Sequence, residues 1–198
     1  MQQVGIVILN YNNTNDVKKC IDSALKYTPI DITKYVIVDN GSRECVKDEI
    51  HRFLSKKTNS YQCIDEKGTN VLEQITYICL PKNIGYAGGN NVGIDFFRQF
   101  DDISHILILN SDILFTKDII TPLLAAINTK TNVGVICPLL YRPNGDIEYC
   151  CARRNCSSIC LSLAFSYIFA RIYRKMIADS YILLNEPDLL KKPCFEID

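Results

Sequence analysis

The sequence predicts an α/β fold in which helices cover both faces of a mostly parallel central sheet. Two observations support this prediction. Short runs rich in Val and Ile lack the alternation of half-exposed strands, which is typical of strands buried on both faces. Segments whose apolar residues recur at helical spacing separate these runs. Such an alternation of strand and helix favours parallel strands joined by crossover helices.

The individual elements follow from these patterns. The expected strands are residues 4–9, 35–38, 75–80, 105–109 and 133–137. Helices are expected near residues 17–25, 46–54, 92–97 and 116–128. Asn13 or Thr14 is expected to cap the first helix and Ser42 the second. Residues 56–74 are polar and irregular and are expected to form a surface excursion, and the Pro-Asn-Gly content of residues 142–146 predicts a turn.

The composition excludes several classes of protein. The 198 residues suffice for one core and a small appendage, and 47% of them are hydrophobic. Lys and Arg equal Asp and Glu at 22 each, so no excess of positive charge favours nucleic-acid binding. The first apolar run lacks the basic start and cleavage site of a signal peptide, and no run reaches the roughly 20 residues of a membrane-spanning helix. We therefore expect a cytoplasmic protein and leave open a peripheral contact with the inner face of the membrane.

The ten cysteines form no Cys-x-x-Cys pair, and several lie inside apolar segments. Free, buried thiols in a reducing cytosol are therefore expected. Cys150, Cys151, Cys156 and Cys160 lie close together and could bind zinc as thiolates. Their spacing matches no common zinc module, so free thiols remain the favoured interpretation.

Polar side chains follow two of the predicted strands at the points where the strands end. Leu9, Asn10 and Tyr11 close the first strand, and Asp39 closes the second. In open α/β sheets, ligands bind outside the carboxyl ends of the strands. A tyrosine ring can stack on a base, and a carboxylate can accept hydrogen bonds from a ribose or a base. The alternative is that these residues only form turns and helix caps, and for Asp39 the two interpretations are compatible.

The segment NIGYAGGNN, residues 83–91, is expected to be a glycine loop that opens a helix. Glycines let backbone N–H groups approach a phosphate closely. The alternative is a flexible loop without a ligand. The spacing is not G-x-G-x-x-G and the segment follows the third apolar run instead of the first, which argues against a nicotinamide dinucleotide.

The fourth polar segment is LNSD, residues 109–112, at the end of a buried run. Asp112 and the amide of Asn110 are too few ligands for a closed metal cage. Mg²⁺ and Mn²⁺ often bind through one or two carboxylates, with substrate phosphates and water completing the shell. We therefore expect Asp112 to hold a divalent cation together with a nucleotide. The alternative is that Asp112 caps the helix near residues 116–128.

Together and in this order, the four segments resemble the family 2 glycosyltransferases of the GT-A fold, most closely their bacterial rhamnosyltransferase-like members. The resemblance covers residues 3–146. It implies that the first two strand ends contact the base and ribose, that residues 83–91 lie along the diphosphate and sugar, and that Asn110 replaces the first Asp of the metal motif. The residues expected to bind the nucleotide sugar are Leu9, Asn10, Tyr11, Asp39, Asn83, Gly88, Gly89, Asn91, Asn110 and Ser111, and Asp112 is expected to bind Mn²⁺ or Mg²⁺.

The function that the resemblance implies is an inverting transfer of a sugar from UDP or dTDP, with rhamnose as one candidate. The acceptor would be a glycan or a lipid-linked glycan in envelope polysaccharide synthesis. In the family, the catalytic base lies beyond a strand like PCFEID, residues 193–198, so no base is assigned here. We accordingly expect a donor-binding core in residues 1–146 and an incomplete acceptor-side region in residues 147–198.

Two other functions stay open. A sugar nucleotidyltransferase usually carries a glycine- and Arg-rich loop with a Lys after the first strand, and residues 10–14 have neither. A non-catalytic module that binds nucleotide sugars would need the same donor site without a base.

Residues 159–173 are apolar on nearly every helical face and are flanked by Arg153, Arg154, Arg174 and Lys175. A helix of this kind needs cover on more than one side. The cover could come from the acceptor-side region, from a second copy of the chain, or from an anionic membrane surface that the flanking basic residues contact.

Overall fold

The computed structural model describes residues 3–65, 71–129 and 133–148. The chain divides into two compact units, Met1–Pro122 and Leu123–Asp198, and the first unit holds the sheet. The strands are β1 (Gln3–Asn10), β2 (Thr33–Asp39), β3 (Tyr61–Ile64), β4 (Ile75–Cys79) and β5 (Ile103–Asn110), and the helices are α1 (Asn15–Tyr27), α2 (Glu44–Leu54), α3 (Gly85–Phe97) and α4 (Ile120–Ile127). The α/β prediction is confirmed.

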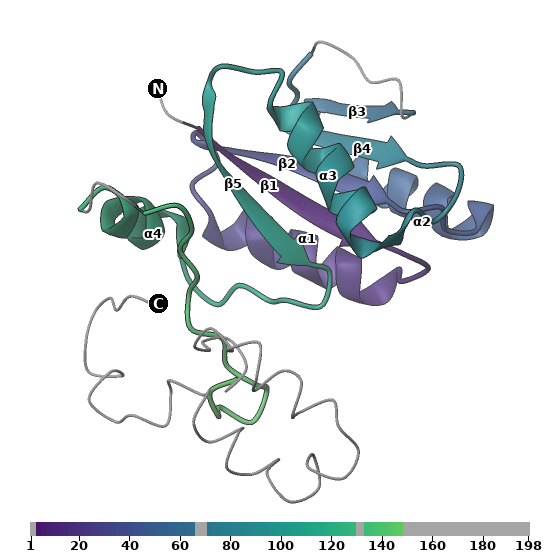
Figure 1. Ribbon diagram of the computed structural model, residues 1–198. Coiled ribbons are helices and arrows are strands. Elements are labelled where there is room, and N and C mark those ends of the chain that lie inside the picture. Colours follow the sequence, from purple (N-terminus) through teal and green to yellow (C-terminus); the bar gives the residue numbers. More distant parts are fainter. Residues whose placement is uncertain (1–2, 66–70, 130–132, 149–198) are drawn as a thin grey trace, which may run out of the picture. The chain divides into compact units, whose positions relative to one another are not determined.

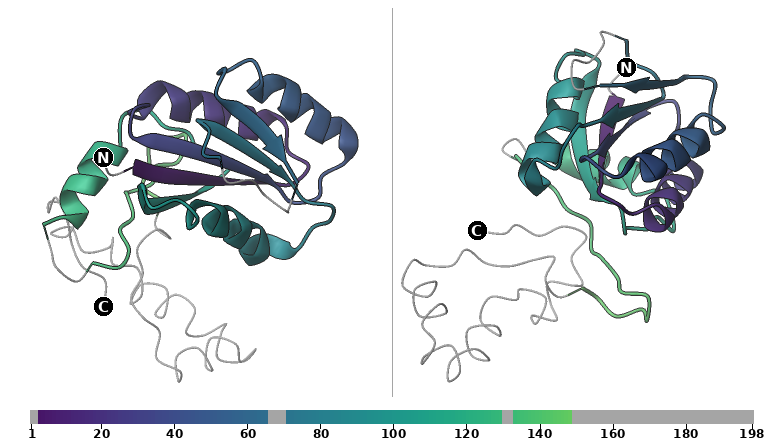
Figure 2. Two further views of the ribbon diagram at one scale, coloured as in Figure 1. Left: turned by 90° about the horizontal axis from the view of Figure 1, so that it is seen from above. Right: turned by 90° about the vertical axis from the view of Figure 1, so that its right-hand side faces the viewer.

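The described strands form one sheet in the order β3-β4-β2-β1-β5, and every pairing is parallel (Figure 1). The chain steps from β1 to β2 in one direction and returns from β4 past β1 to β5 in the other. Because such crossovers are right-handed, opposite steps place their helices on opposite faces of the sheet. Accordingly, α1 and α2 cover one face and α3 covers the other (Figure 2).

Small residues let α3 lie unusually close to the sheet. A Cβ atom at Gly93 of α3 would lie 2.5 Å from Cγ1 of Val7, and one at Gly5 of β1 would lie 2.5 Å from the ring of Phe97. The core on this side consists of Val7, Val36, Val38, Ile78, Leu80, Phe96 and Phe97. The close approach therefore fixes the position of α3 over the centre of the sheet.

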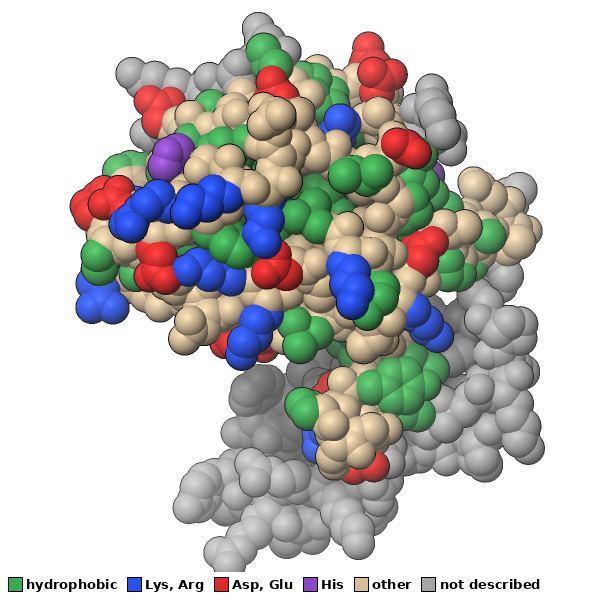
Figure 3. Space-filling view, turned by 180° about the vertical axis from the view of Figure 1, so that it is seen from behind, with side chains coloured by type: hydrophobic (Ala, Val, Ile, Leu, Met, Phe, Trp, Pro, Cys, Tyr) green, Lys and Arg blue, Asp and Glu red, His purple; other side chains and the backbone are tan. Residues whose placement is uncertain are grey.

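The face over α1 and α2 carries many charged side chains, with acids lying among the bases (Figure 3). Lys18 is paired with Glu49, and Lys57 is paired with Asp22, both at 2.5 Å. Lys57 also lies 4.5 Å from the ring centroid of Phe53. The long lysine side chains thus cover apolar surface of α2 at Phe53, and their charged ends form ion pairs with nearby acidic residues.

Three expectations about elements are wrong. Residues 61–64 form β3, although they belong to a stretch expected to be irregular, because a short edge strand needs no continuous apolar run. Residues 133–137 form no strand with any described residue, and Val135 is 87% exposed. The glycine segment is no loop, since Gly85 already begins α3.

The helix ends also differ in part from expectation. Asn13 does cap α1, since its Oδ1 accepts the backbone N–H of Asp16 at 3.2 Å. Ser42 does not cap α2, which begins after Arg43 without a side-chain cap. Asp118 caps α4 by accepting the backbone N–H of Ile120 at 2.8 Å. The alternative that Asp112 caps this helix is therefore wrong.

The turn at residues 142–146 is confirmed, with Tyr141 and Ile147 paired across it. None of the helices in the described part of the chain is long and apolar enough to cross a membrane. The cysteines at 150–160, the apolar segment 159–173 and the segment 193–198 lie outside the described residues.

Candidate functional site

The polar strand ends singled out in the sequence meet at one edge of the sheet. Asn10 at the end of β1 lies opposite Asp39 at the end of β2, and Leu9 lies opposite Asn110 at the end of β5. In parallel sheets, the strand ends at a reversal of strand order form a crevice for ligands, and here the order reverses at β1. This edge is therefore the candidate site.

Asp39 lies at the centre of a buried network of hydrogen bonds. Its Oδ1 accepts the backbone N–H of Ser42 at 2.7 Å. Its Oδ2 accepts a hydrogen bond from Nδ2 of Asn10 and another from the hydroxyl of Tyr77, both at 3.2 Å. Burial, and then the charge of Asp39, raise the pKa of Tyr77, so the phenol stays protonated and donates. The carboxylate, 0% exposed, thus joins β1, β2 and β4.

The segment after β2 is fastened to the segment before α3 by Asn40. Its Nδ2 donates to Oδ1 of Asn83 at 3.1 Å and to the carbonyl of Gly85 at 3.0 Å, and its Oδ1 accepts the N–H of Ile84 at 3.0 Å. Gly41 adopts a φ of +77°, and a Cβ atom there would lie 2.3 Å from the backbone of Lys82. Two of the predicted motifs, VIVDNGS and NIGYAGGNN, are therefore one packed unit.

The first turns of α3 connect this unit to β5. The hydroxyl of Tyr86 donates to Oδ1 of Asn110 at 2.8 Å. Gly89 is buried, and a Cβ atom there would lie 2.4 Å from Cδ1 of Leu9, so close helix–sheet packing explains this glycine. Gly88 is half-buried and Asn91 is exposed on α3.

The turn after β5 presents Asp112 to solvent. The N–H of Ile113 donates to the carbonyl of Asn110 at 3.2 Å and closes this turn, with Ser111 half-buried inside it. The carboxylate of Asp112 is exposed and accepts no hydrogen bond from the described residues. Burial, and then the charge of Asp112, raise the pKa of the nearby Cys20 thiol to about 12, so this thiol stays neutral.

A metal ion would find few protein ligands at this turn. The described residues contain no group of three or more His, Cys, Asp and Glu side chains that could hold a metal ion. The amide oxygen of Asn110 already accepts the Tyr86 hydroxyl. Asp112 alone fits a cation whose shell is completed by substrate phosphates and water, and does not fit a closed structural metal site.

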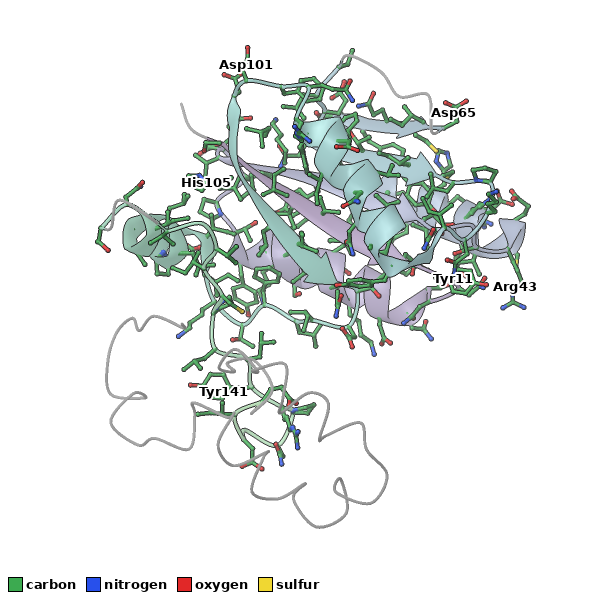
Figure 4. The ribbon with its side chains drawn as sticks, viewed as in Figure 1. Tyr11, Arg43, Asp65, Asp101, His105 and Tyr141 are labelled. Carbon is green, nitrogen blue, oxygen red and sulfur yellow. The ribbon has the colours of Figure 1, made fainter. Side chains whose placement is uncertain are left out.

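Two exposed tyrosine rings lie at this edge of the sheet. Tyr11 is 52% exposed and Tyr86 is 61% exposed. Figure 4 places Tyr11 beside Arg43 at the carboxyl end of the sheet, whereas Asp101 lies at the opposite end. The amide oxygen of Asn10 is buried and accepts no hydrogen bond from the described residues. An unused acceptor of this kind calls for a donor from a ligand or water.

Sequence reasoning missed three residues of this site. Tyr77 lies inside an apolar strand run, where nothing in the sequence indicates that its hydroxyl reaches Asp39. Asn40 follows Asp39 directly, and nothing in the sequence indicates that its amide fastens residues 83–85. Tyr86 could have been noticed, since it is an aromatic residue within the glycine segment.

Residues 5–177 match the sequence model of glycosyl transferase family 2. The chain belongs to this family. The family and the GT-A fold expected from the four motifs are thus confirmed.

This family 2 glycosyltransferase chain is 27% identical over 146 residues to the low-salt glycan biosynthesis hexosyltransferase Agl10 of Haloferax volcanii. The match covers 73% of this chain and 39% of Agl10, so the chain spans about two fifths of its relative's length. Among solved structures, the mannosyltransferase PcManGT from Pyrobaculum calidifontis, in complex with GDP-Man and Mn²⁺, aligns with a TM-score of 0.50 and 16% identity. That alignment covers 72% of this chain and 36% of PcManGT, and it shows the fold alone.

Proposed function

We propose that the edge formed by the ends of β1, β2 and β5 binds a nucleoside-diphosphate sugar for an inverting glycosyl transfer. The observation that carries the proposal is the exposed carboxylate of Asp112, which accepts no hydrogen bond from the described residues and follows β5 at this edge. The match to family 2 supports the class of reaction. A UDP or dTDP sugar is the donor that we propose, and a glycan or lipid-linked glycan is the acceptor.

Several residues at the edge have distinct roles in this proposal. The exposed ring of Tyr11 stacks on the base. Asp39, Asn10 and Tyr77 hold the strand ends in place, and a direct contact of Asp39 with the ribose or base stays a prediction. The start of α3 faces the diphosphate and sugar with Asn83, Gly88 and Asn91. That the donor-binding core comprises residues 1–146 stays part of this proposal.

Asp112 would hold Mn²⁺ or Mg²⁺, as expected of a carboxylate that leaves most of the shell to phosphate oxygens. When bound, such an ion neutralises charge on the departing diphosphate. The chain's own residues position the donor so that an acceptor hydroxyl reaches the anomeric carbon from the face opposite the diphosphate. A carboxylate would take the proton from that hydroxyl, and none of the described residues is assigned this role.

Nucleotide binding tests the proposal directly. Titration of the purified chain with UDP and dTDP should show affinity at least roughly tenfold higher in Mn²⁺ than in EDTA. Asp112→Ala should lose this gain. Asp101→Ala is the matched control, because it removes the same exposed charge at the other end of the sheet and should keep the gain. An unchanged Mn²⁺ gain in Asp112→Ala would show that Asp112 does not hold the ion.

The alternative of a non-catalytic binding module shares the same donor edge. Transfer from a labelled nucleotide sugar to a glycan acceptor, measured with the purified protein, separates the two functions. Family 2 membership disfavours a sugar nucleotidyltransferase.

A further inference from the structure

Two cysteines that are distant in the sequence lie side by side on β3 and β4. Cys63 is opposite Tyr77 in the parallel register, and Cys79 is two residues further along β4, which places both thiols on the same face. Their Sγ atoms are 3.9 Å apart. Asp65, which is labelled in Figure 4, directly follows β3 and shows where this strand ends, two residues after Cys63. The pair lies outside the proposed donor-binding residues.

The surroundings make the two thiols unequal. Cys63 is exposed, whereas Cys79 is half-buried. The hydrogen bond from the Cys79 thiol, and then the charge of His51, lower the pKa of Cys63 to about 6, although burial opposes them. The same hydrogen bond and burial raise the pKa of Cys79. Cys63 therefore loses its proton more readily than Cys79, and the Cys79 thiol can then donate to the Cys63 thiolate.

His51 is held next to the pair by a contact of its own. Its Nδ1 lies 2.7 Å from the hydroxyl of Tyr61 on β3, and the two ring centroids are 5.5 Å apart. The position of the ring on α2 is thus fixed by β3, the strand that carries Cys63. Because the described residues contain no group of three ligating side chains around a common point, metal binding does not explain the cluster.

We propose that Cys63 and Cys79 are a redox-active dithiol, which a small-molecule disulfide oxidises to a covalent bond between β3 and β4. An accessible thiolate next to a less accessible thiol is the arrangement that such exchange requires. The two sulfur atoms must approach by about 2 Å to reach bonding distance. Because the register displaces Cys79 by two residues from the partner of Cys63, rotation of the side chains has to be combined with a shift of the short edge strand β3 along β4.

The reaction takes two steps. The Cys63 thiolate attacks one sulfur atom of the small disulfide, a bond to Cys63 forms as the bond between the two small sulfur atoms breaks, and one small thiolate leaves and takes a proton from solvent. The Cys79 thiol then gives its proton to solvent and attacks Sγ of Cys63, and the second small thiolate leaves and is protonated. In total the protein dithiol loses two electrons, and the small disulfide is reduced to two thiols.

Peptide mapping provides the test. The reduced full chain is incubated with mixtures of oxidised and reduced glutathione, the remaining thiols are capped, and the protein is digested with trypsin. Residues 58–67 and 68–82 form separate tryptic peptides with one cysteine each, so a link between them identifies the bond. We expect these linked peptides to be the main oxidised product. A wild-type chain that carries glutathione on Cys63 without this link would overturn the proposal.

Variants assign the order of attack. Cys79→Ser should accumulate glutathione on Cys63, whereas Cys63→Ser should take up glutathione at Cys79 roughly tenfold more slowly. Cys45→Ser, which removes an exposed thiol on α2, is the matched control and should form the linked peptides as the wild type does. Equal rates in the first two variants would contradict Cys63 as the attacking thiolate.

Discussion

The two carboxylates that the sequence singled out have opposite surroundings. Asp39 is 0% exposed and accepts three hydrogen bonds from the protein. Asp112 is exposed and accepts none from the described residues. A buried carboxylate that accepts hydrogen bonds from the protein stabilises the fold, whereas a carboxylate exposed to solvent is available to a ligand. The end of β2, where Asp39 is buried and hydrogen-bonded, therefore serves to hold the strands together and is called the closed end. The exposed turn after β5, which carries Asp112, is the candidate metal position.

The largest expected effect comes from removing the buried carboxylate. Asp39→Ala leaves the Ser42 N–H, the Asn10 amide and the Tyr77 hydroxyl without their acceptor, and should lower the free energy of unfolding by at least about 3 kcal/mol. Asp112→Ala should change it by less than about 0.5 kcal/mol. Urea unfolding followed by circular dichroism measures both values. Similar losses in the two variants would remove the distinction between the closed end and the exposed turn.

A second test concerns the close packing of α3 on β1, the strand whose Asn10 donates to Asp39. Gly93→Ala brings a Cβ atom to 2.5 Å from the branched side chain of Val7 and should cost about 2 kcal/mol of unfolding free energy. Gly88→Ala, in the same helix, meets only Ile84 at 3.1 Å and should cost clearly less. Thermal unfolding of the two variants checks this order. A reversed order would show that α3 can move away from the sheet without loss.

The smallest expected effect compares two tyrosine hydroxyls. Tyr77→Phe removes a buried hydrogen bond to a carboxylate and should cost about 1.5 kcal/mol of unfolding free energy. Tyr86→Phe removes an exposed bond to the amide of Asn110 and should cost less than about 0.5 kcal/mol. The same denaturation experiment serves for both. If Tyr86→Phe is the more destabilising variant, the end of β5 also serves to hold the strands together.

Much of the fold could be predicted from local patterns. Four strands lie in the expected runs of β-branched and apolar residues, and the turn at residues 142–146 follows from its Pro-Asn-Gly content. β1, β2 and β4 are buried as expected, whereas β5 was expected to be buried and has only Leu109 buried, because it lies at the edge of the sheet. β3 was missed because an edge strand is paired on one side only and tolerates polar residues such as Gln62. The glycines predict a loop at the start of α3 because glycine disfavours helices, but α3 includes Gly89 and Gly93, where close packing on Leu9 and on Val7 leaves no room for a larger side chain.

The candidate site, too, could be predicted from the sequence only in part. That polar residues follow the strands could be seen in the sequence, and this order of motifs was sufficient to predict the family. The proximity of Cys63 to Cys79, which are 16 positions apart in the sequence, could not be predicted, because it depends on the register of two strands. The contact of Tyr77 with Asp39 is likewise a consequence of which strands are neighbours.

Local patterns predict the alternation of strands and helices and the positions of Asp39 and Asp112 after their strands, because hydrophobic periodicity is a local property of the chain. Which of the two carboxylates is enclosed depends on the arrangement of the strands in space. The strand order places β2 between β4 and β1, so that side chains from both neighbours close over Asp39. β5 is at the edge of the sheet and is followed by an open turn, so Asp112 keeps its carboxylate in water. Burial depends on neighbours in space, and those neighbours come from distant parts of the chain.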